Sequence, residues 1–390
     1  MAITVRDLLK LPYFEPVTVV AGQTGLDRPV TAAGILDYEY AEGYTMKEQV
    51  FRRNDLVVSS LLFAKENPSA LLDALRALIE LGATGLAYKA VLMDRLPEDA
   101  LRLADEHQFP ILRFGMELYL EEFVFQIMDN VKMDHQLRER EELLDALVAG
   151  RTPKEGLRQA ARGIDPYLES HLYSVYVARK KRMEYHDFER LYRGPTGVKQ
   201  IDDGITVCRY KNGFFLLLSG ESGEEKKYID RFRDVMAYLD LKADGCWVGY
   251  GTLVRCPEEL DLGLQQAYFA SLCARAKGQQ SQGYQSMGVY QILVPSLSSP
   301  HLAAYMRRFL SPLLEGGDSG DELLNTAIAY ISEEGDIGKA AERIYCHKNT
   351  VRYRLNKLHE RLCPNSSDSA FYEQLSIAVK IYLLSRPDGA

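Results

Sequence analysis

The sequence has few of the features that mark secreted, membrane or disulfide-bonded proteins. It contains six cysteines but no C-x-x-C pair, and their irregular spacing indicates reduced thiols rather than a disulfide framework. No uninterrupted apolar run approaches the roughly 20 residues that a membrane-spanning helix needs. The opening segment carries Arg6 and Asp7 where a secretory signal would be apolar. We therefore expect a soluble, cytoplasmic protein that has no membrane partner.

The sequence also lacks the residue groupings that catalysis or metal binding requires. We find no acidic metal cluster and no nucleophile–base pair, and the seven histidines are scattered along the chain. We therefore expect no catalytic residue, no metal site and no cofactor, and we do not expect an enzyme.

The formal net charge of -8 argues against a protein that coats nucleic acid without sequence preference, because such binding grows with every lysine and arginine presented to phosphate. One stretch departs from this acidic average. Between Lys339 and Arg361, seven lysines and arginines face only Glu342 and Glu360. Any contact with DNA is therefore expected to be local and to involve this stretch.

The length of 390 residues favours two or three domains over a single core. In residues 1–120, apolar runs at 56–59, 85–88 and 110–113 alternate with helical patterns that begin near Pro68 and Pro97. This alternation predicts a parallel α/β domain. Residues 121–150 then read as one connecting helix without a strict heptad repeat, in which a dimer seam is possible.

Residues 151–295 predict a second, α+β domain. The strand candidates are residues 172–177, 204–209, 214–218 and 246–250, and helical patterns cover 224–241 and 257–276. Asn212-Gly213 between the two middle strands is a strong hairpin signal. The polar residues 277–283 predict a loop, and the glycine-rich residues 315–320 predict a boundary.

The last region, residues 296–390, is helical by its hydrophobic period and contains a candidate helix-turn-helix at about 336–362. Asp336 is a plausible N-cap for a short helix whose small Ala340 permits a close helix crossing. A turn through residues 345–347 leads into a third helix that begins near Asn349. Four aliphatic side chains form its buried stripe: Val351, Leu355, Leu358 and Leu362.

This assignment leaves a polar and basic surface at the start and along one side of the third helix. Amides and hydroxyls there suit base edges in the major groove, and lysines and arginines suit phosphates. The candidate DNA contacts are His347, Lys348, Asn349, Thr350, Arg352, Tyr353, Arg354, Asn356 and Lys357. Two alternatives are an ordinary solvated basic face and a zinc site formed by Cys346, His347, His359 and Cys363, whose spacing is unlike that of zinc fingers.

At residues 347–355 the sequence resembles the C-terminal helix-turn-helix of the PucR family of regulators, which are named for purine catabolism. Residues 4–9, 25–30 and 54–60 resemble the N-terminal sensory domain of that family. The resemblance implies a response to a small molecule such as a purine-degradation product or an amino acid. It also implies a GGDEF-like fold for the middle domain, although residues 211–215 lack the acidic pair that a diguanylate cyclase needs, so we expect no such activity.

A ligand of a parallel sheet should lie beyond the carboxyl ends of its strands. The side chains at those ends are Asp37, Tyr38, Ser59, Ser60, Lys89 and Arg113, and we take them as candidate effector-binding residues. Two cations among hydroxyls suit a ligand with a carboxylate or polarised carbonyls. The alternative is that Lys89 and Arg113 cap the fold or pair with surface acids.

Together these observations predict a DNA-binding transcription regulator that responds to a small metabolite and controls catabolic genes. Its partners would be double-stranded promoter DNA, the effector and a second copy of the chain, because a two-fold protein suits a two-part operator. The alternative function is a nucleotide-binding signalling protein, related to diguanylate cyclases, that does not bind DNA.

Overall fold

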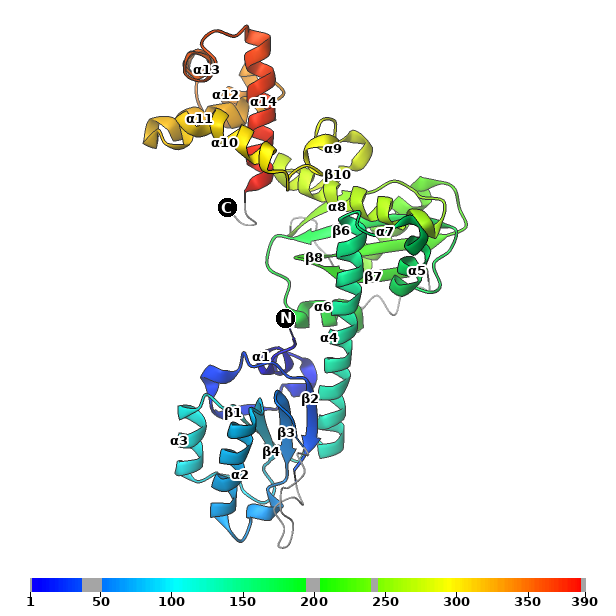
Figure 1. Cartoon of the computed structure of the whole chain (residues 1–390), viewed down its shortest axis with the longest axis vertical. Coiled ribbons are helices and arrows are strands. Elements are labelled where there is room, and N and C mark those ends of the chain that lie inside the picture. Colours follow the sequence, from blue (N-terminus) through cyan, green and yellow to red (C-terminus); the bar gives the residue numbers. More distant parts are fainter. Residues whose placement is uncertain (1, 37–50, 194–203, 240–244, 387–390) are drawn as a thin grey trace. The chain divides into compact units, whose positions relative to one another are not determined.

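The computed structural model describes residues 2–36, 51–193, 204–239 and 245–386. It divides the chain into two compact units, one formed by Met1–Glu142 with Glu184–Pro195 and the other by Leu143–Met183 with Thr196–Ala390. The predicted multidomain layout is confirmed, with an α/β unit first, a second sheet in the middle and helices at the C-terminal end (Figure 1).

The first unit contains a five-stranded sheet in the order β1-β5-β4-β3-β2. The strands are β1 (Thr18–Ala21), β2 (Ala32–Ile35), β3 (Asp55–Ser59), β4 (Gly85–Lys89) and β5 (Ile111–Phe114). The predicted parallel arrangement holds from β2 to β5. The sequence interpretation missed β1, which pairs antiparallel with β5 at the edge of the sheet. Such an edge strand is common on otherwise parallel sheets.

The helices α2 (Pro68–Leu81) and α3 (Glu98–Glu106) begin where the proline signals predict. The unit also contains α1 (Val5–Leu9), α6 (Tyr185–Arg193) and the 3₁₀ turns η1 (Pro12–Phe14), η2 (Gln23–Gly25) and η3 (Leu62–Ala64). Helix α2 ends at Gly82, whose φ of 79° is the left-handed conformation of a helix C-cap. The apolar sides of α2 and α3 face strands β3 to β5 in one buried cluster.

Helix α4 (Leu120–Val148) confirms the single long helix predicted between the first two regions. In the first unit it is anchored by Phe123, whose ring stacks on Phe114 of β5 with centroids 4.3 Å apart. Its last turns belong to the second unit, where Leu144 and Leu147 are buried.

The second unit contains another five-stranded sheet, in the order β10-β9-β6-β8-β7. The strands are β6 (His171–Arg179), β7 (Ile205–Tyr210), β8 (Gly213–Gly220), β9 (Cys246–Tyr250) and β10 (Ser281–Gly283). The predicted hairpin joins β7 to β8 through Lys211 and Asn212, and Lys211 has a φ of 48°. The sequence predicted a loop over residues 277–283, but residues 281–283 form the short strand β10, which pairs parallel with β9.

Helix α8 (Leu260–Lys277) connects this sheet to the C-terminal helices, and α5 (Lys154–Ile164), α7 (Glu225–Tyr238) and η6 (Pro257–Glu259) complete the sheet region. Gly249 of β9 allows α8 to approach the sheet, because a Cβ there would lie 2.0 Å from the carbonyl oxygen of Ala267. One side of α8 buries Leu264 and Ala267 against the sheet, and another buries Cys273 among the C-terminal helices.

The C-terminal region consists of η7 (Tyr284–Ser286), α9 (Tyr290–Leu293), α10 (Pro300–Leu314), α11 (Gly317–Ser332), α12 (Ile337–Arg343), α13 (Lys348–Leu362) and α14 (Asp368–Ser385). The glycine-rich residues 315–320 include the turn between α10 and α11. They do not separate two cores, because both helices share one apolar core with α8 and α14. The domain limits at 120, 150 and 295 stay predictions. No helix in the described ranges is both long and apolar enough to cross a lipid bilayer.

Candidate DNA-binding surface

The helix-turn-helix is built on a small apolar core shared by α11, α12 and α13. Ala340 of α12 and Val351 of α13 are fully buried and pack with Ala329 of α11 and Ala341. Alanines at a crossing let two backbones approach closely, which confirms the role predicted for Ala340. The compact crossing fixes α13 by one side and leaves its other side to solvent.

Both α12 and α13 begin with a side-chain cap. The carboxylate of Asp336 accepts hydrogen bonds from the backbone N–H groups of Gly338 at 2.7 Å and Lys339 at 3.1 Å, as predicted for an N-cap. These bonds lower the pKa of Asp336 below its usual value. At the start of α13, Nδ1 of His347 accepts a hydrogen bond from the backbone N–H of Asn349 at 3.2 Å. His347 is therefore an exposed N-cap of α13, the helix predicted to contact DNA.

The turn between α12 and α13 places an aromatic ring in solvent. Tyr345 has a φ of 52°, the left-handed conformation that non-glycine residues adopt at a cost, and it is 97% exposed. The sequence interpretation placed Tyr345 in the turn but did not count it as a contact residue. The sequence did contain a signal for Tyr345, because a bulky side chain stands at a tight turn where glycine is common.

The exposed side of α13 carries most of the predicted DNA contacts. Lys348, Asn349, Arg352, Tyr353, Asn356 and Lys357 are exposed, and Thr350 is half-buried. Nζ of Lys357 lies 4.9 Å from the centre of the Tyr353 ring, and a guanidinium nitrogen of Arg352 lies 3.4 Å from Oδ1 of Asn349. Within the described part of the chain, no carboxylate lies at ion-pair distance from Lys348, Arg352 or Lys357. We name this side of α13 the basic face.

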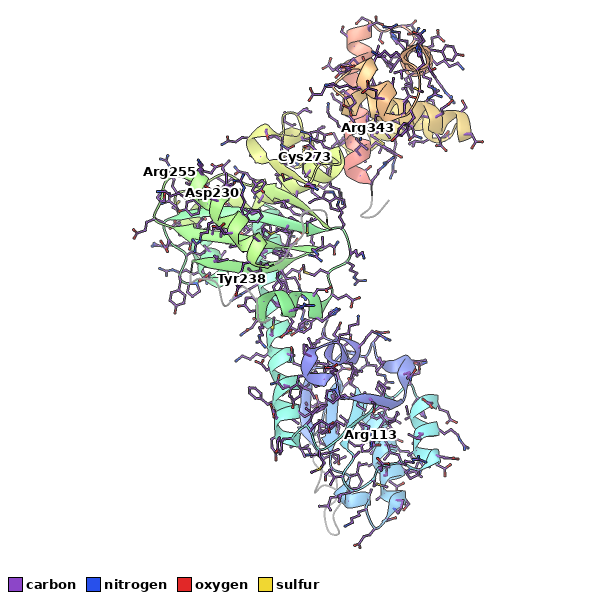
Figure 2. The ribbon with its side chains drawn as sticks, turned by 180° about the vertical axis from the view of Figure 1, so that it is seen from behind. Arg113, Asp230, Tyr238, Arg255, Cys273 and Arg343 are labelled. Atoms are coloured by element: carbon purple, nitrogen blue, oxygen red, sulfur yellow. The ribbon has the colours of Figure 1, made fainter. Side chains whose placement is uncertain are left out.

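Arg354 is the exception among the predicted contacts. Its guanidinium forms an ion pair with Glu322 of α11 and lies 3.4 Å from the hydroxyl of Thr326, and its side chain is 18% exposed. Arg354 therefore braces α13 against α11 and is not on the basic face. Arg343, which is labelled in Figure 2, is likewise engaged within the fold, since it forms an ion pair of 2.8 Å with Glu333. These two pairs reduce the local basic excess that the sequence shows.

The alternative zinc site does not fit this geometry. Cys346 and His347 precede α13, whereas His359 and Cys363 lie at its other end. At 1.5 Å per residue, His347 and His359 are separated by about 18 Å along the helix, too far to share an ion. Nε2 of His359 lies 3.0 Å from the carbonyl oxygen of Ser366, so this ring is part of the α13–α14 connection.

The candidate effector residues of the first unit are only partly brought together. Asp37 and Tyr38 lie outside the described residues. The hydroxyl of Ser59 is buried, donates to the carbonyl of Leu36 at 2.5 Å and accepts from the backbone N–H of Leu61 at 2.9 Å. Ser60, which follows it at the end of β3, is half-buried. Ser59 is thus held by the backbone around it.

Lys89 is the last residue of β4 and Arg113 the last but one of the neighbouring β5, and the two side chains lie on opposite faces of the sheet. The register pairs Arg113 with Tyr88, and Lys89 with Phe114, and successive side chains alternate between faces. Arg113 forms an ion pair of 2.5 Å with Asp94, and Nζ of Lys89 lies 5.3 Å from the centre of the Tyr119 ring (Figure 2 labels Arg113). The expected pair of cations around one ligand is therefore not formed.

Comparison with known proteins assigns both ends of the chain. Residues 323–381 match the PucR C-terminal helix-turn-helix domain, and residues 7–131 match the Purine catabolism regulatory protein-like family. The chain carries both of these PucR-family domains. The match to the helix-turn-helix domain, over residues 323–381, covers α12, α13 and the basic face. Residues 132–322 lie outside both matches, so the GGDEF-like interpretation of the middle region stays a prediction.

Two individual proteins are similar to this chain. The purine catabolism regulatory protein of Bacillus subtilis (strain 168) is 27% identical over 147 residues, which are 37% of this chain and 26% of that protein. The match thus spans about a quarter of that relative's length. The crystal structure of a regulator of polyketide synthase expression from Bifidobacterium adolescentis is 12% identical and covers 62% of this chain and 96% of that one. Its TM-score of 0.30 is too low to support an argument.

Proposed function

We propose that this protein is a transcription regulator that binds promoter DNA through the basic face of α13. The observation that carries the proposal is a set of three exposed cations, Lys348, Arg352 and Lys357, on a helix held by a buried helix-turn-helix crossing. Cations without carboxylate partners can neutralise phosphates and release counterions. The match to the PucR C-terminal helix-turn-helix domain supports the same function.

The basic face also supplies groups that can distinguish bases. The amide of Asn349 at the first turn and that of Asn356 farther along α13 are exposed. An asparagine amide forms two hydrogen bonds with the major-groove edge of adenine. We propose that Asn349 recognises bases and that Lys357 binds the phosphate backbone of the DNA. Arg354 instead stabilises the fold through its ion pair with Glu322.

The test is a titration of the full-length protein against a fluorescent duplex from its own upstream region and against a scrambled duplex, followed by anisotropy. Lys357→Ala should weaken binding to both duplexes equally. Asn349→Ala should reduce the preference for the upstream duplex by roughly tenfold. The matched control is Arg307→Ala, which removes an exposed arginine of α10 outside the helix-turn-helix. The proposal is wrong if the wild-type protein binds neither duplex at low salt, the result that a nucleotide-binding signalling protein without DNA contact would give.

The proposed effector is a small metabolite bound by the first unit. Support comes from the family match over residues 7–131 and from the name of the Bacillus relative, so purine catabolites are among the first compounds to try. A ligand that binds only the folded state must raise the melting temperature. Xanthine, urate, allantoin and single amino acids should be screened in this way, and Lys89→Ala should reduce the shift that any hit produces.

We also propose that the chain acts as a homodimer on a two-part operator, because paired helix-turn-helix units suit half-sites about one helical turn apart. Light scattering of the full-length protein, free and with its operator, measures the number of chains. A single chain on a single protected half-site at saturation would contradict this part of the proposal.

A further inference from the structure

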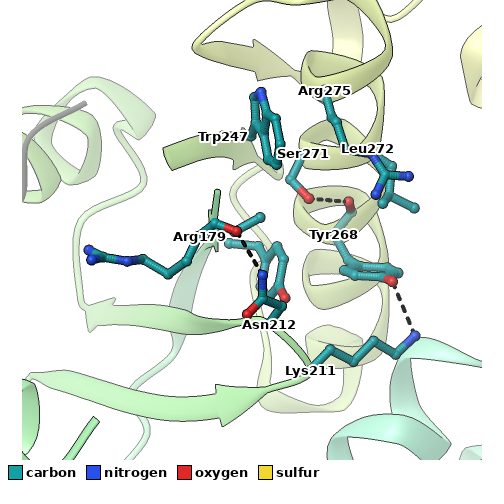
Figure 3. A pocket seen from close by; sticks show the side chains of 10 residues that line it. Arg179, Lys211, Asn212, Trp247, Tyr268, Ser271, Leu272 and Arg275 are labelled. Atoms are coloured by element: carbon teal, nitrogen blue, oxygen red, sulfur yellow. Dashed lines mark hydrogen bonds between the residues drawn. The ribbon is translucent and has the colours of Figure 1, made fainter. Parts of the chain in front are cut away.

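The second unit contains a cavity of about 230 Å³ beside the turn of the β7–β8 hairpin (Figure 3). Its walls come from three parts of the fold: the sheet, through Trp247 of β9 and Tyr176 of β6; the hairpin turn, through Lys211 and Asn212; and α8, through Tyr268 and Arg275. The cavity is therefore formed within one unit and lies away from the basic face of α13.

The close approach of α8 to β9 explains why the cavity forms at this place. Gly249 lies directly under α8, since a Cβ there would be 2.3 Å from the backbone nitrogen of Ser271. Trp247 is two residues earlier on the same strand and therefore on the same face of the sheet. Its indole, which pairs in register with the small Ala178, stands next to α8. A large aromatic group beside a small residue leaves the space that becomes the cavity.

The chemical character of the walls is aromatic and cationic. The rings of Tyr176 and Tyr268 meet edge to face with centroids 5.2 Å apart, and Trp247 contributes a third aromatic surface. Among the described residues, no carboxylate lines the cavity, whereas Lys211 and Arg275 do. This is the opposite of the chain as a whole, whose net charge is -8.

The two cations are held at the cavity by specific contacts. Nζ of Lys211 donates a hydrogen bond of 3.1 Å to the hydroxyl of Tyr268 and lies 4.6 Å from the centre of that ring (Figure 3). Arg275 donates to the carbonyl oxygen of Leu384 at 3.3 Å, and its burial lowers its pKa. Figure 3 shows that the side chain of Arg179 extends away from the cavity, so its charge is not directed there.

We propose that this cavity is a second small-molecule site, specific for a planar aromatic carboxylate of one or two rings. Aromatic walls favour a flat ring, and Lys211 with Arg275 favours a carboxylate over a neutral group. The size agrees, because an apolar cavity of about 150 Å³ already holds benzene. Since Arg275 also bonds to the end of α14, a bound carboxylate would compete with the carbonyl of Leu384 for the same guanidinium.

Trp247 is the one tryptophan of the chain, so its fluorescence reports on this cavity and no other. The full-length protein should be titrated with benzoate, which has ring and charge, with benzamide, which has the ring only, and with acetate, which has the charge only. We expect a saturable change with benzoate, binding of benzamide about tenfold weaker, and no saturable change with acetate. A thermal shift with naphthalene-2-carboxylate measures the two-ring case.

The variant test uses Lys211→Met, which removes the charge and keeps most of the side-chain stem. This variant should weaken the binding of benzoate at least about fivefold and leave the affinity for benzamide unchanged. Lys226→Ala, at an exposed position of α7 in the same unit, is the matched control and should change neither. The proposal is overturned if benzoate gives no saturable change up to about 20 mM, if benzamide binds as well as benzoate, or if Lys211→Met binds benzoate as the wild type does.

Discussion

The guanidinium of Arg354 pairs with the carboxylate of Glu322, so that α13 is tied to α11 by a charge that the sequence alone assigns to DNA. The two residues belong to different helices, and Arg354 has its side chain largely covered, whereas the three cations of the basic face are exposed. We therefore assign Arg354 to the stability of the fold and propose DNA binding only for the exposed cations of the same helix.

Arg354→Ala should destabilise the protein and leave the number of phosphate contacts unchanged. Removing Arg354 breaks a partly covered ion pair and a contact with Thr326, so the free energy of unfolding should fall by about 1 kcal/mol. Glu322→Gln should lower stability in the same direction, which urea denaturation of both variants measures. If Arg354→Ala instead keeps full stability and lowers the salt dependence of DNA binding, Arg354 contacts phosphate and our assignment is wrong.

Ala340→Leu should disrupt the helix crossing. Ala340 is fully buried between α12 and its neighbours, and the extra atoms have no space, which costs about 1–3 kcal/mol. The neighbouring Lys339 is exposed, so Lys339→Leu is the control and should change stability by less than about 0.5 kcal/mol. Equal melting temperatures for the two variants would show that the crossing is looser than described.

Asp336 should make the helix-turn-helix sensitive to acid. Its carboxylate accepts two backbone hydrogen bonds that lower its pKa in the folded state. A lowered folded pKa gives stability that is present above the unfolded pKa, about 3.9, and is lost as the pH falls through the folded pKa. Asp336→Ala should therefore melt earlier than the wild type at pH 7, and the difference should shrink below about pH 4. Asp336→Asn, which keeps a cap acceptor, should remain close to the wild type at pH 7, and a constant difference at all pH values would contradict the account.

Tyr345→Gly should separate stability from binding. A glycine relieves the left-handed backbone at this turn, which should raise the free energy of unfolding by up to about 1 kcal/mol. The same change removes an exposed ring next to the basic face, so binding to DNA should weaken if the ring contacts the duplex. Tyr345→Asn, which tolerates the same backbone and lacks the ring, distinguishes the two effects. Anisotropy and thermal denaturation on the three proteins give both quantities, and a Tyr345→Gly protein of lower stability would contradict the strain argument.

Local signals predicted the elements that depend on neighbours in the sequence. Asp336 caps α12 and Ala340 fills the crossing, and both effects act within a few residues or through size alone. Tertiary partners were not predictable in the same way. Glu322 is 32 residues from Arg354, and nothing in the spacing brings the two together.

The register of the strands explains why the sequence did not correctly predict the arrangement of the candidate effector residues. Lys89 is the last residue of β4, but Arg113 lies one residue before the end of β5, and a difference of one residue in register decides which face a side chain occupies. The edge strand β1 (Thr18–Ala21) was missed, and its antiparallel pairing with β5 is a tertiary contact between residues up to 95 positions apart. The cavity beside Trp247 was also beyond sequence analysis, since it depends on the approach of α8 at Gly249.

The most direct test of the account is the salt dependence of DNA binding by the full-length protein and by the triple variant Lys348→Ala, Arg352→Ala, Lys357→Ala. Each phosphate contact contributes about 0.9 to the slope of log K against log salt concentration, so the magnitude of the slope should fall by roughly 2.7. A triple variant that folds normally and retains the wild-type slope would show that the basic face of α13 does not contact DNA.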